Sequence, residues 1–403
     1  MQTGQKMNPT DTDILISGGG VAGLTAAAAF GAAGFRVICA DPTPPVTNET
    51  DDSADLRTTA FLQPSIPVLE AAGLWARLAP HAAPLQIMRI IDAGGPTPEP
   101  RVIKDFVASD ISDLPFGWNL PNWLLRREMV ARLAELPNVT FLPGISTTAL
   151  TTRSEQALVR LSDGRRIAAK LVIAADGRAS KMREAAGIPV KTMRYGQKAL
   201  AFAVTHLIAH DNVSTEIHRS GGPFTLVPLP DRDGKPCSAV VWMERGPEVA
   251  RLAALPVPEF EAAMNLRSCQ VLGPLTLASR RSVWPIISQI AAEMVGERLA
   301  LMAEAAHVVP PIGAQGLNMS LADLAALLDL AAKHDLGSPA MLAAYSKRRH
   351  LDVKVRVSGI DALNRVSMLG TPSLRDLRAA GLNALYSLAP VRKTLMKAGL
   401  GMR

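Results

Sequence analysis

Three glycines and an aspartate near the start of the chain have the spacing of a nucleotide-binding turn. Gly18, Gly20 and Gly23 follow the apolar run 14–17, and Asp41 comes 23 residues after Gly18. The first glycine permits a tight turn, the second lets the backbone approach a pyrophosphate, and the third lets a helix pack closely on a strand. The carboxylate of Asp41 can accept hydrogen bonds from an adenosine ribose but would repel a 2′-phosphate. The pattern therefore predicts a binding site for FAD or NAD.

The segments around these glycines have the order strand, turn, helix, strand. Residues 14–17 are apolar, and an Ala-, Leu- and Phe-rich helical pattern runs from Val21 and Ala22 to about residue 33. Gly34 is placed to end that helix, and residues 36–40 have the pattern of a second strand. Because the first N–H groups of a helix have no partner inside it, those near Val21 and Ala22 can bind phosphate. A flexible turn alone explains neither the two strands nor the spaced acid.

Two later segments carry related chemistry. The strand pattern 171–174 leads into Asp176 and Gly177, and the strand pattern 299–303 leads into the loop 304–318, after which a helical pattern runs to about residue 328. A glycine-spaced loop that feeds a helix N-terminus presents N–H groups to an anion or a carbonyl oxygen. An Asp-Gly pair by itself is a common turn. The three motifs in this order are far more specific than any one of them.

With these motifs the chain resembles the class A FAD-dependent aromatic hydroxylases, the superfamily of 4-hydroxybenzoate hydroxylase, and within it most of all the ubiquinone-biosynthesis branch. The resemblance spans nearly the whole chain. Its segments are GGGVAG (18–23), LRTTAFLQPSIPVLEAAGLW (56–75), ADGRASKMR (175–183), YGQKAL (195–200), LVPLP (226–230), AEAAHVVPPIGAQGLNMSLAD (303–323) and APVRKTLMKAGLG (389–401).

The resemblance implies FAD as the cofactor, with NAD(P)H and O2 as cosubstrates. It assigns the ADP half of FAD to Gly18, Gly20, Val21, Ala22, Gly23 and Asp41. Arg57 and Arg126 would reach the flavin phosphate and the ribityl chain. Asp176 and Gly177 would contact both FAD and the reducing nicotinamide nucleotide.

The third motif is assigned to the isoalloxazine edge, where negative charge develops on reduction. The residues placed there are Glu304, Pro311, Gly313, Gln315, Gly316, Leu317 and Asn318. Pro311 would lie over the site where oxygen reacts, and it is the one residue assigned to catalysis. The family usually has Gly-Asp where this chain has Ala303-Glu304. Glu304 can accept the same hydrogen bonds from one methylene further out, whereas the Cβ of Ala303 occupies a spot that the family keeps bare.

The fold expected is α/β (α+β), with a Rossmann-like FAD-binding domain, an antiparallel-sheet substrate domain and C-terminal helices. The expected ranges are 11–80, 100–190 and 275–340 for the FAD-binding domain, 81–99 and 191–274 for the substrate domain, and 341–403 for a basic helical segment. Alternating runs at 198–207, 224–230 and 238–244 predict the antiparallel sheet. The Met and Leu side chains of residues 361–400 are expected in the core.

The resemblance implies a monooxygenase that hydroxylates the ring of a prenylated phenol in ubiquinone biosynthesis, through a flavin C4a-hydroperoxide. A hydroxylase of a small soluble aromatic acid is one alternative. Such relatives hold the carboxylate with Arg and polarise the phenol with tyrosines, and this chain has only three Tyr. A non-catalytic scaffold within a multi-protein ubiquinone-biosynthesis complex is the second alternative, motivated by Ala303-Glu304.

The net charge of +7 is concentrated at the C-terminal end of the chain. Residues 341–403 carry 12 Lys and Arg against 3 Asp and Glu. Because Leu, Val and Met are interleaved with these charges, the segment suits an anionic membrane surface. The solvated outer face of ordinary helices explains the pattern equally well. The segment lacks the aromatic residues that stack on bases, so no nucleic acid is expected as a partner.

The remaining composition favours a cytoplasmic protein. The three cysteines are odd in number and widely separated, which excludes a disulfide framework and a cysteine zinc site and fits a reducing compartment. His206, His210 and His218 lack a metal-like spacing with carboxylates, so no metal is expected. Residues 14–35 carry no charge, but six glycines argue against a membrane-spanning helix. We expect a cytoplasmic protein, with peripheral association at the inner membrane face as the alternative that the basic segment raises.

Overall fold

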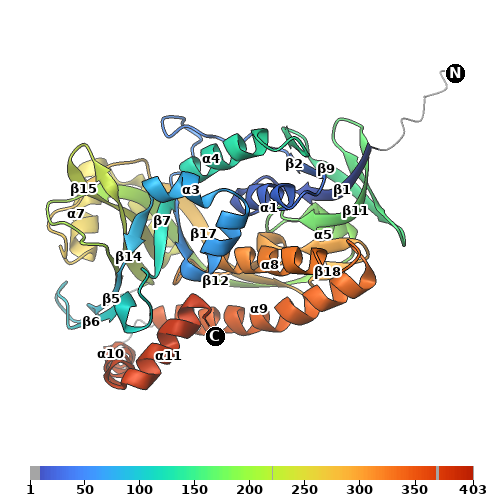
Figure 1. Ribbon diagram of the computed structural model, residues 1–403. Coiled ribbons are helices and arrows are strands. Elements are labelled where there is room, and N and C mark those ends of the chain that lie inside the picture. Colours follow the sequence, from blue (N-terminus) through green and yellow to red (C-terminus); the bar gives the residue numbers. More distant parts are fainter. Residues whose placement is uncertain (1–9, 220, 369–371, 403) are drawn as a thin grey trace.

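An eight-stranded sheet forms the layer that carries the first glycine motif (Figure 1). The computed structural model describes residues 10–219, 221–368 and 372–402, so residues 369–371 and 403 of the expected C-terminal segment lie outside the described part. β1 runs parallel to both β2 and β11. The strands, in spatial order, are β18 (Val295–Gly296), β19 (Leu299–Leu301), β11 (Arg166–Ala174), β1 (Thr10–Ser17), β2 (Val37–Asp41) and β8 (Val139–Pro143), with β10 (Ala157–Leu161) paired to β11 and β9 (Thr147–Thr152) paired to β10.

Apolar side chains on both faces explain why β1 is a central strand. Ile14, Leu15 and Ile16 are fully buried, as expected where helices cover both faces of a parallel sheet. The helices packed around this layer are α1 (Val21–Ala32), α4 (Asn122–Ala134), α5 (Lys181–Ala185) and α8 (Gln315–Ala331). α1 contacts both α4 and α8 (Figure 1). Its small alanine side chains are buried and allow this close approach.

A nine-stranded sheet forms the second layer. Its strands, in order, are β20 (His307–Val308), β17 (Ser282–Ala291), β12 (Val190–Thr205), β15 (Lys235–Arg245), β14 (Pro223–Arg232), β13 (Val213–His218), β5 (Ile87–Asp92) and β6 (Val102–Val107), with β16 (Thr276–Leu277) beside β12. Neighbouring strands are antiparallel except for the parallel pair β13 and β5. One face packs against α6 (Gly246–Ala254) and α7 (Val257–Arg267) through an aromatic cluster that includes Phe202, Trp242 and Phe260.

A three-stranded sheet packs against the nine-stranded one, and the chain also forms several short helices. The strands are β3 (Thr58–Leu62), β7 (Gly117–Pro121) and β4 (Ala83–Leu85). The short helices are η1 (Gln63–Ser65), α2 (Ile66–Ala71), α3 (Trp75–Leu78), η2 (Ala79–His81), η3 (Ala108–Asp110) and η4 (Ala303–Ala305). The Asn119 amide of β7 donates to the Pro228 carbonyl of β14 over 3.0 Å, which ties this small sheet to the nine-stranded one.

The α/β class with two sheet layers and C-terminal helices is confirmed, but strand membership differs from the expected ranges. β6 and β17 come from ranges expected for the FAD-binding domain, yet both pair within the nine-stranded sheet. The reason is that β17 has a long register with β12, from Val190 to Ala201, and apolar alternation cannot reveal which sheet a strand joins. The domain boundaries themselves remain predictions.

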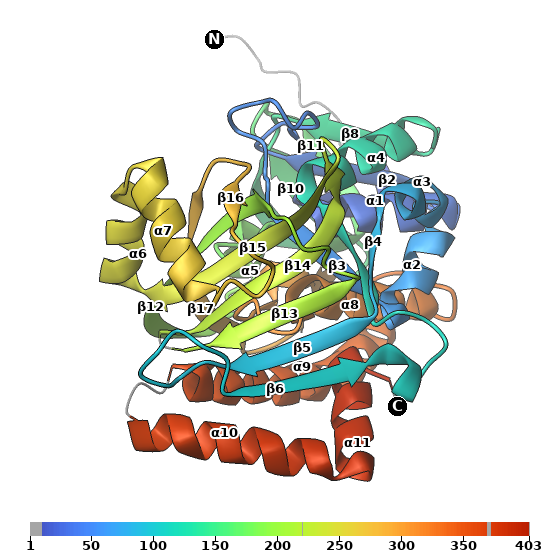
Figure 2. The same ribbon diagram turned by 90° about the vertical axis from the view of Figure 1, so that its left-hand side faces the viewer.

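Three helices close the chain: α9 (Pro339–Ser367), α10 (Pro372–Ser387) and α11 (Ala389–Leu400). Figure 2 shows α10 and α11 below the β5–β6 edge of the nine-stranded sheet. Tyr386 of α10 packs edge-on against Phe106 of β6 and donates its hydroxyl to the Asp105 carbonyl. The expectation that Met and Leu of 361–400 belong to the core holds for Met396 and Leu400 but is wrong for Leu363, Leu385, Leu388 and Leu395, which are about half exposed. A helix with one neighbour buries only one face, so these leucines point outward.

Candidate functional site

The first glycine turn has no room for side chains. Gly18 ends β1 with a φ of +107°, and a Cβ there would lie 2.3 Å from the carbonyl oxygen of Ala175. A Cβ on Gly23 would lie 1.9 Å from the Gly18 carbonyl oxygen. Gly20 differs, because a Cβ there would meet nothing within 4 Å. The turn thus needs Gly18 and Gly23 for packing, and it leaves open space at Gly20 at the N-terminus of α1, where a phosphate can approach.

Asp41 lies beside this turn, as the spacing predicts. Its Oδ2 accepts a hydrogen bond from the Gly19 N–H over 2.6 Å, and its Oδ1 accepts one from the Thr43 N–H over 2.8 Å. Each carboxylate oxygen has a second lone pair. Asp41 can therefore accept hydroxyl hydrogen bonds while it holds the glycine turn.

The second and third motifs meet the first at the carboxyl edge of the parallel strands. A Cβ on Gly18 would also lie 2.8 Å from the Cα of Asp176. The Met302 N–H, just before the third motif, donates to the Ala174 carbonyl over 3.0 Å. The buried guanidinium of Arg183 donates to the Ala305 carbonyl over 2.8 Å. Ligands bind at this edge in open α/β sheets, so the three motifs form one candidate site.

Among the side chains assigned to FAD, two buried polar atoms have no protein partner in the described part of the chain. They are Oδ1 of Asp176 and Nε of Arg126. The other carboxylate oxygen of Asp176 accepts the Met182 N–H over 3.2 Å. Buried polar atoms almost always find a partner, so a free acceptor and a free cationic donor beside a glycine cradle fit a ligand with hydroxyl and phosphate groups. FAD has both, and the residues present fit it.

Arg57 and Arg126 are brought together by an acid that the sequence analysis missed. Arg57 makes a bidentate pair with Asp55, with distances of 2.8 and 2.7 Å, and Arg126 lies 3.7 Å from the same carboxylate. Burial alone would raise the pKa of Asp55, but the Arg57 guanidinium and the Asn122 amide hold that pKa below its usual range. The Arg57 guanidinium also lies 3.7 Å above the Trp284 ring of β17. Arg57, Arg126 and Asp55 together therefore carry one net positive charge.

The third motif leads into the N-terminus of α8. Glu304, Pro311 and Gly316 are exposed, whereas Gly313 and Leu317 are half-buried. No side chain caps the helix, so its first N–H groups have no capping partner. These groups can meet the electron-rich edge of a flavin ring, as the resemblance implies.

The side chains of Asn318 and Gln315 form hydrogen bonds within the protein. Asn318 accepts hydrogen bonds from the Leu62 N–H and the Ser65 hydroxyl, and it donates to the carbonyls of Ala60 and Ala314. All its ordinary hydrogen-bonding capacity is used. Asn318 therefore joins β3 and η1 to the start of α8.

Gln315 joins the same loop to the end of the chain. Its amide donates to the Gly313 carbonyl over 2.9 Å and to the Gly399 carbonyl of α11 over 2.7 Å. Its carbonyl accepts from Arg356 of α9 over 3.2 Å. For both Asn318 and Gln315, the proposed contact with FAD is therefore limited to the backbone.

A buried charged network supports the third motif from below. Asp323 of α8 is fully buried. Its carboxylate hydrogen-bonds to His307 Nε2 over 2.7 Å and to Arg349 Nε over 2.8 Å. It also accepts a hydrogen bond from the Ala303 N–H over 3.3 Å. Burial would raise the pKa of Asp323, but His307 and Arg349 hold it below its usual range. His307 is thus a structural side chain. Asp323, Arg349 and the buried Arg183 were missed in the sequence analysis, although Asp323 and Arg183 end two of the quoted segments.

The central positions of the nine-stranded sheet hold only neutral side chains on the face opposite α6 and α7, and we call this area the neutral face. Strand alternation places eight side chains there, which are Ala199, Ala201, Ala203, Thr225, Val227, Ala239, Val241 and Met243. Ala203, Thr225, Val227 and Val241 are half-buried although β12, β14 and β15 are inner strands. Trp284, whose ring stacks under the Arg57 guanidinium, pairs with Ala199 on the same side of the sheet. This face therefore borders the candidate site.

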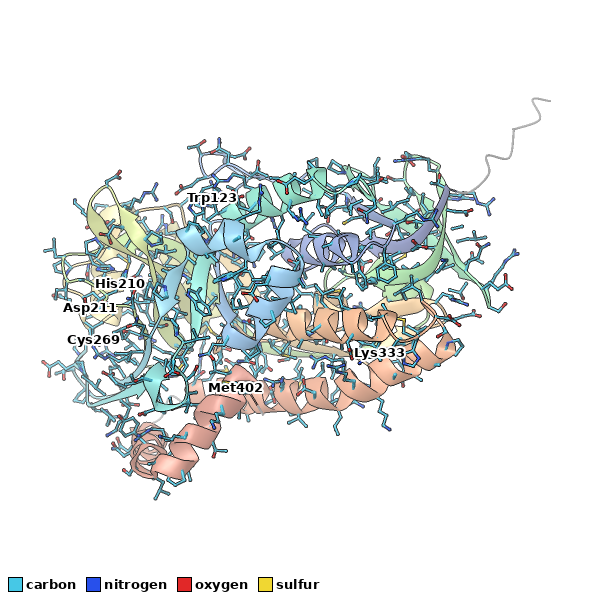
Figure 3. The ribbon with its side chains drawn as sticks, in the orientation of Figure 1. Trp123, His210, Asp211, Cys269, Lys333 and Met402 are labelled. Carbon is cyan, nitrogen blue, oxygen red and sulfur yellow. The ribbon has the colours of Figure 1, made fainter. Side chains whose placement is uncertain are left out.

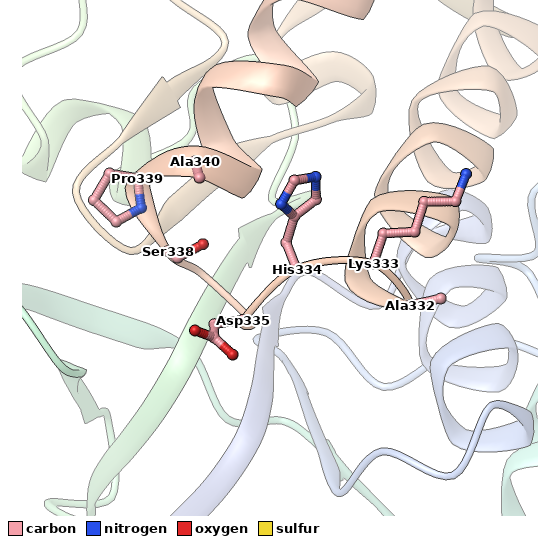
Figure 4. Close-up of a pocket in the computed structure, with 7 residues that line it drawn as sticks. All are labelled: Ala332, Lys333, His334, Asp335, Ser338, Pro339 and Ala340. Atoms are coloured by element: carbon pink, nitrogen blue, oxygen red, sulfur yellow. The ribbon is translucent and has the colours of Figure 1, made fainter.

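An open surface hollow lies away from the three motifs. It has a volume of about 730 Å³ and lies at the turn between α8 and α9, with Lys333, His334, Asp335 and Ser338 along it (Figure 4). Figure 3 shows Lys333 at the opposite end of the molecule from His210 and Cys269. No residue of the three motifs lines this hollow. In the described part of the chain, no group of His, Cys, Asp and Glu could hold a metal ion.

Comparison with known proteins gives matches along nearly the whole chain. The FAD binding domain family matches residues 11–358. Ubiquinone hydroxylase UbiL of Rhodospirillum rubrum is 32% identical over 96% of this chain and 89% of its own length. The 3-demethoxyubiquinol 3-hydroxylase of Escherichia coli is 27% identical over 98% of this chain and 100% of its own. Among solved structures, p-nitrophenol 4-monooxygenase PnpA of Pseudomonas putida superposes with a TM-score of 0.78 at 19% identity, covering 98% of this chain and 100% of that one.

Proposed function

The chain belongs to the FAD binding domain family, and we propose that it hydroxylates the aromatic ring of a prenylated phenol in ubiquinone biosynthesis. It is an FAD-dependent monooxygenase with a lipophilic aromatic substrate, and NAD(P)H and O2 are its cosubstrates. The names of its relatives support the pathway, and the three converging motifs support FAD as the cofactor.

The neutral face of the nine-stranded sheet is the observation that carries the choice of substrate. Its eight central positions hold Ala, Val, Thr and Met and no charged side chain. A soluble aromatic acid needs a guanidinium for its carboxylate, and the Arg57 guanidinium at the border of this face is already paired with Asp55. An isoprenoid chain needs only apolar area, at about 25 cal/mol per Å² buried. A prenylated phenol fits this face better than a benzoate does.

Bound FAD would take reducing equivalents from NAD(P)H and use O2 to supply the oxygen atom that enters the ring. The protein's part is binding and orientation. Gly18, Gly20, Gly23 and Asp41 would hold the ADP half, and the N–H groups at the start of α8 would stabilise negative charge on the ring edge. Pro311 would lie over that ring and limit the access of water.

The exposed side of the C-terminal helices supports a further proposal, that the protein works at an anionic membrane surface. Leu385, Leu388 and Leu395 are exposed there, together with Lys393 and Lys397. Exposed apolar and basic side chains on neighbouring helices suit the headgroup region of anionic lipids. Among the described residues, no helix has the length and apolarity to cross a bilayer. A partner protein of a ubiquinone-biosynthesis complex would be the other occupant of this side.

The test compares two substrates with the purified, FAD-loaded protein. We expect NADH or NADPH oxidation to be stimulated by a short-chain 2-polyprenylphenol, with a hydroxylated product found by mass spectrometry. Faster oxidation with 4-hydroxybenzoate would favour the soluble-acid alternative. A protein that stays colourless after addition of FAD would favour the scaffold alternative.

A further inference from the structure

Two titratable side chains stand at the edge of the neutral face. Glu216 and His218 flank the buried Ile217 on β13, so they lie on the face opposite the α6–α7 core. The Nε2 atom of His218 lies 2.7 Å from Oε1 of Glu216, and only 13% and 14% of their side chains are exposed. Strand register places Glu216 beside Thr225 and His218 beside Pro223 of β14. The pair therefore continues the rows of the neutral face.

Within β13, Glu216 is the carboxylate next to that face, and Lys104 of β6 lies two strands away, beyond Ile90. Thr225 pairs next with Val241 of β15, and both are neutral and half-buried. On the other side, β5 places Ile90 beside Glu216 and Asp92 beside His218. The Asp92 carboxylate accepts from Arg101 over 2.6 Å, so its charge already has a partner.

We propose that Oε2 of Glu216 accepts a hydrogen bond from the ring hydroxyl of the substrate, and that His218 positions this carboxylate. The inference rests on the proposed function, because it assumes a phenol on the neutral face. His218 donates its Nε2–H to Oε1, which fixes the carboxylate and leaves Oε2 for the substrate. Nδ1 of His218 has no partner among the described residues, so the bond to Glu216 is what orients the imidazole.

One polar acceptor on a neutral face decides how the ring lies. Apolar contacts hold a prenylated phenol without fixing its direction, since the hydrophobic effect is non-directional. A hydrogen bond from the hydroxyl to a carboxylate is short and charge-assisted, and it selects which ring carbon faces the flavin. It also draws the hydroxyl proton away from the ring, which makes the ring more electron-rich. The proton stays on the phenol oxygen, so no bond breaks in this step.

The test compares a 2-polyprenylphenol with its methyl ether, which lacks the donor. Dissociation constants are measured from the change in flavin absorbance of the holoenzyme. For the wild type, the phenol is expected to bind more tightly than the ether by about tenfold or more, the usual worth of a hydrogen bond to a charged group. Glu216→Gln and His218→Leu should weaken binding of the phenol and leave that of the ether unchanged. Ser214→Ala, on the same face of β13, is the matched control and should change neither constant.

The outcomes separate this inference from the proposed function. A Glu216→Gln variant that weakens phenol and ether equally, or weakens neither, overturns the role of Glu216. The role of Glu216 is also overturned if the wild-type holoenzyme binds the phenol no more tightly than the ether. A wild-type holoenzyme that yields no hydroxylated prenylphenol overturns the proposed function, and the inference falls with it. FAD content and thermal midpoint, measured for every variant, show that each is folded.

Discussion

Ala303 has a backbone conformation that an alanine rarely adopts, and it stands at the start of the motif assigned to the flavin ribityl chain. Its φ is +55°, and its N–H donates to the buried carboxylate of Asp323. A non-glycine residue in the left-handed region costs about 1–2 kcal/mol. The family's glycine would avoid this cost, so the buried network around Asp323 compensates for the missing glycine here.

Replacing Ala303 with glycine should stabilise the protein. Relief of the left-handed strain exceeds the entropy lost by glycine, leaving a gain of about 0.5–1 kcal/mol in the free energy of unfolding. Urea unfolding of the FAD-free protein measures this gain. Ala306→Gly is the control, because Ala306 is buried with a negative φ of −95° and should lose stability instead. A loss of stability in Ala303→Gly would contradict the account.

Asp323→Asn should cost much of the protein's stability at neutral pH. Removing one partner of a buried ion pair typically costs about 3–5 kcal/mol, because the Arg349 guanidinium stays buried and His307 loses its carboxylate partner. The pKa of Asp323 is lowered in the folded state, so its contribution is present above the unfolded pKa of about 3.9 and is lost as the pH falls through the folded value. Denaturant unfolding at a series of pH values should therefore show a weaker acid dependence in the variant. Equal acid dependence in both proteins would refute this role.

At the scale of elements, the C-terminal helix α11 is fastened to the loop that carries the flavin motif. Gln315 bridges the Gly399 carbonyl of α11, the Gly313 carbonyl of the loop, and Arg356 of α9. Met396 and Leu400 of α11 are buried. The end of the chain therefore contributes to the wall around the candidate site, and the loop and the helix are expected to move together.

Gln315→Leu should loosen α11 while the rest of the fold survives. The change removes the amide donor to Gly399 and costs about 1–3 kcal/mol locally, because a carbonyl loses its partner. Limited trypsin digestion at the exposed Lys393 and Lys397 should become faster, and FAD should dissociate faster. Urea unfolding of the whole chain should change far less than it does in Asp323→Asn. Unchanged digestion and FAD release would show that Gln315 does not fasten the helix.

The elements themselves could be predicted where the signal is local. The unit of β1, α1 and β2 follows from apolar runs, glycines and a spaced acid within residues 14–41, and the third motif follows from one loop before α8. The contacts that assemble the site could not be predicted, because they join distant segments. The hydrogen bonds between Asn318 and Leu62 and between Arg183 and Ala305 depend on how the layers pack, and such bonds leave no spacing pattern in the sequence. The same reason explains why β17 was expected in the FAD-binding domain.

At the scale of the whole molecule, about half of the exposed large apolar side chains among the described residues lie on the C-terminal helices. Leu351 and Val355 of α9 are 70% and 63% exposed, and Leu388 of α10–α11 is 58% exposed. In Figure 1 these helices form the lower side of the molecule. Clustered exposed leucines beside lysines are typical of a surface that contacts a membrane or another molecule. The core expectation for this segment holds for Met396 and Leu400 and is wrong for the exposed leucines, because composition does not reveal which helix face is turned outward.

The protein should bind vesicles that contain anionic phospholipid, and salt should weaken the binding. Each Lys near the surface contributes about 1 kcal/mol, and each leucine adds buried apolar area. The double variant Leu385→Ser, Leu388→Ser should lower the bound fraction in co-sedimentation several-fold. Leu207→Ser is the control, since Leu207 is 77% exposed on the nine-stranded sheet side and should have no effect. Equal binding to neutral vesicles, or an effect of the control, would contradict this use of the surface.

The most direct measurement follows the oxygen atom. The FAD-loaded protein is given NAD(P)H, a short-chain 2-polyprenylphenol and ¹⁸O2, and the product is analysed by mass spectrometry. We predict a ring-hydroxylated prenylphenol that carries one ¹⁸O atom, formed only when FAD, the reductant and oxygen are all present. A yellow, reducible protein that leaves the prenylphenol unlabelled would contradict the central claim that these three motifs build a phenol hydroxylase.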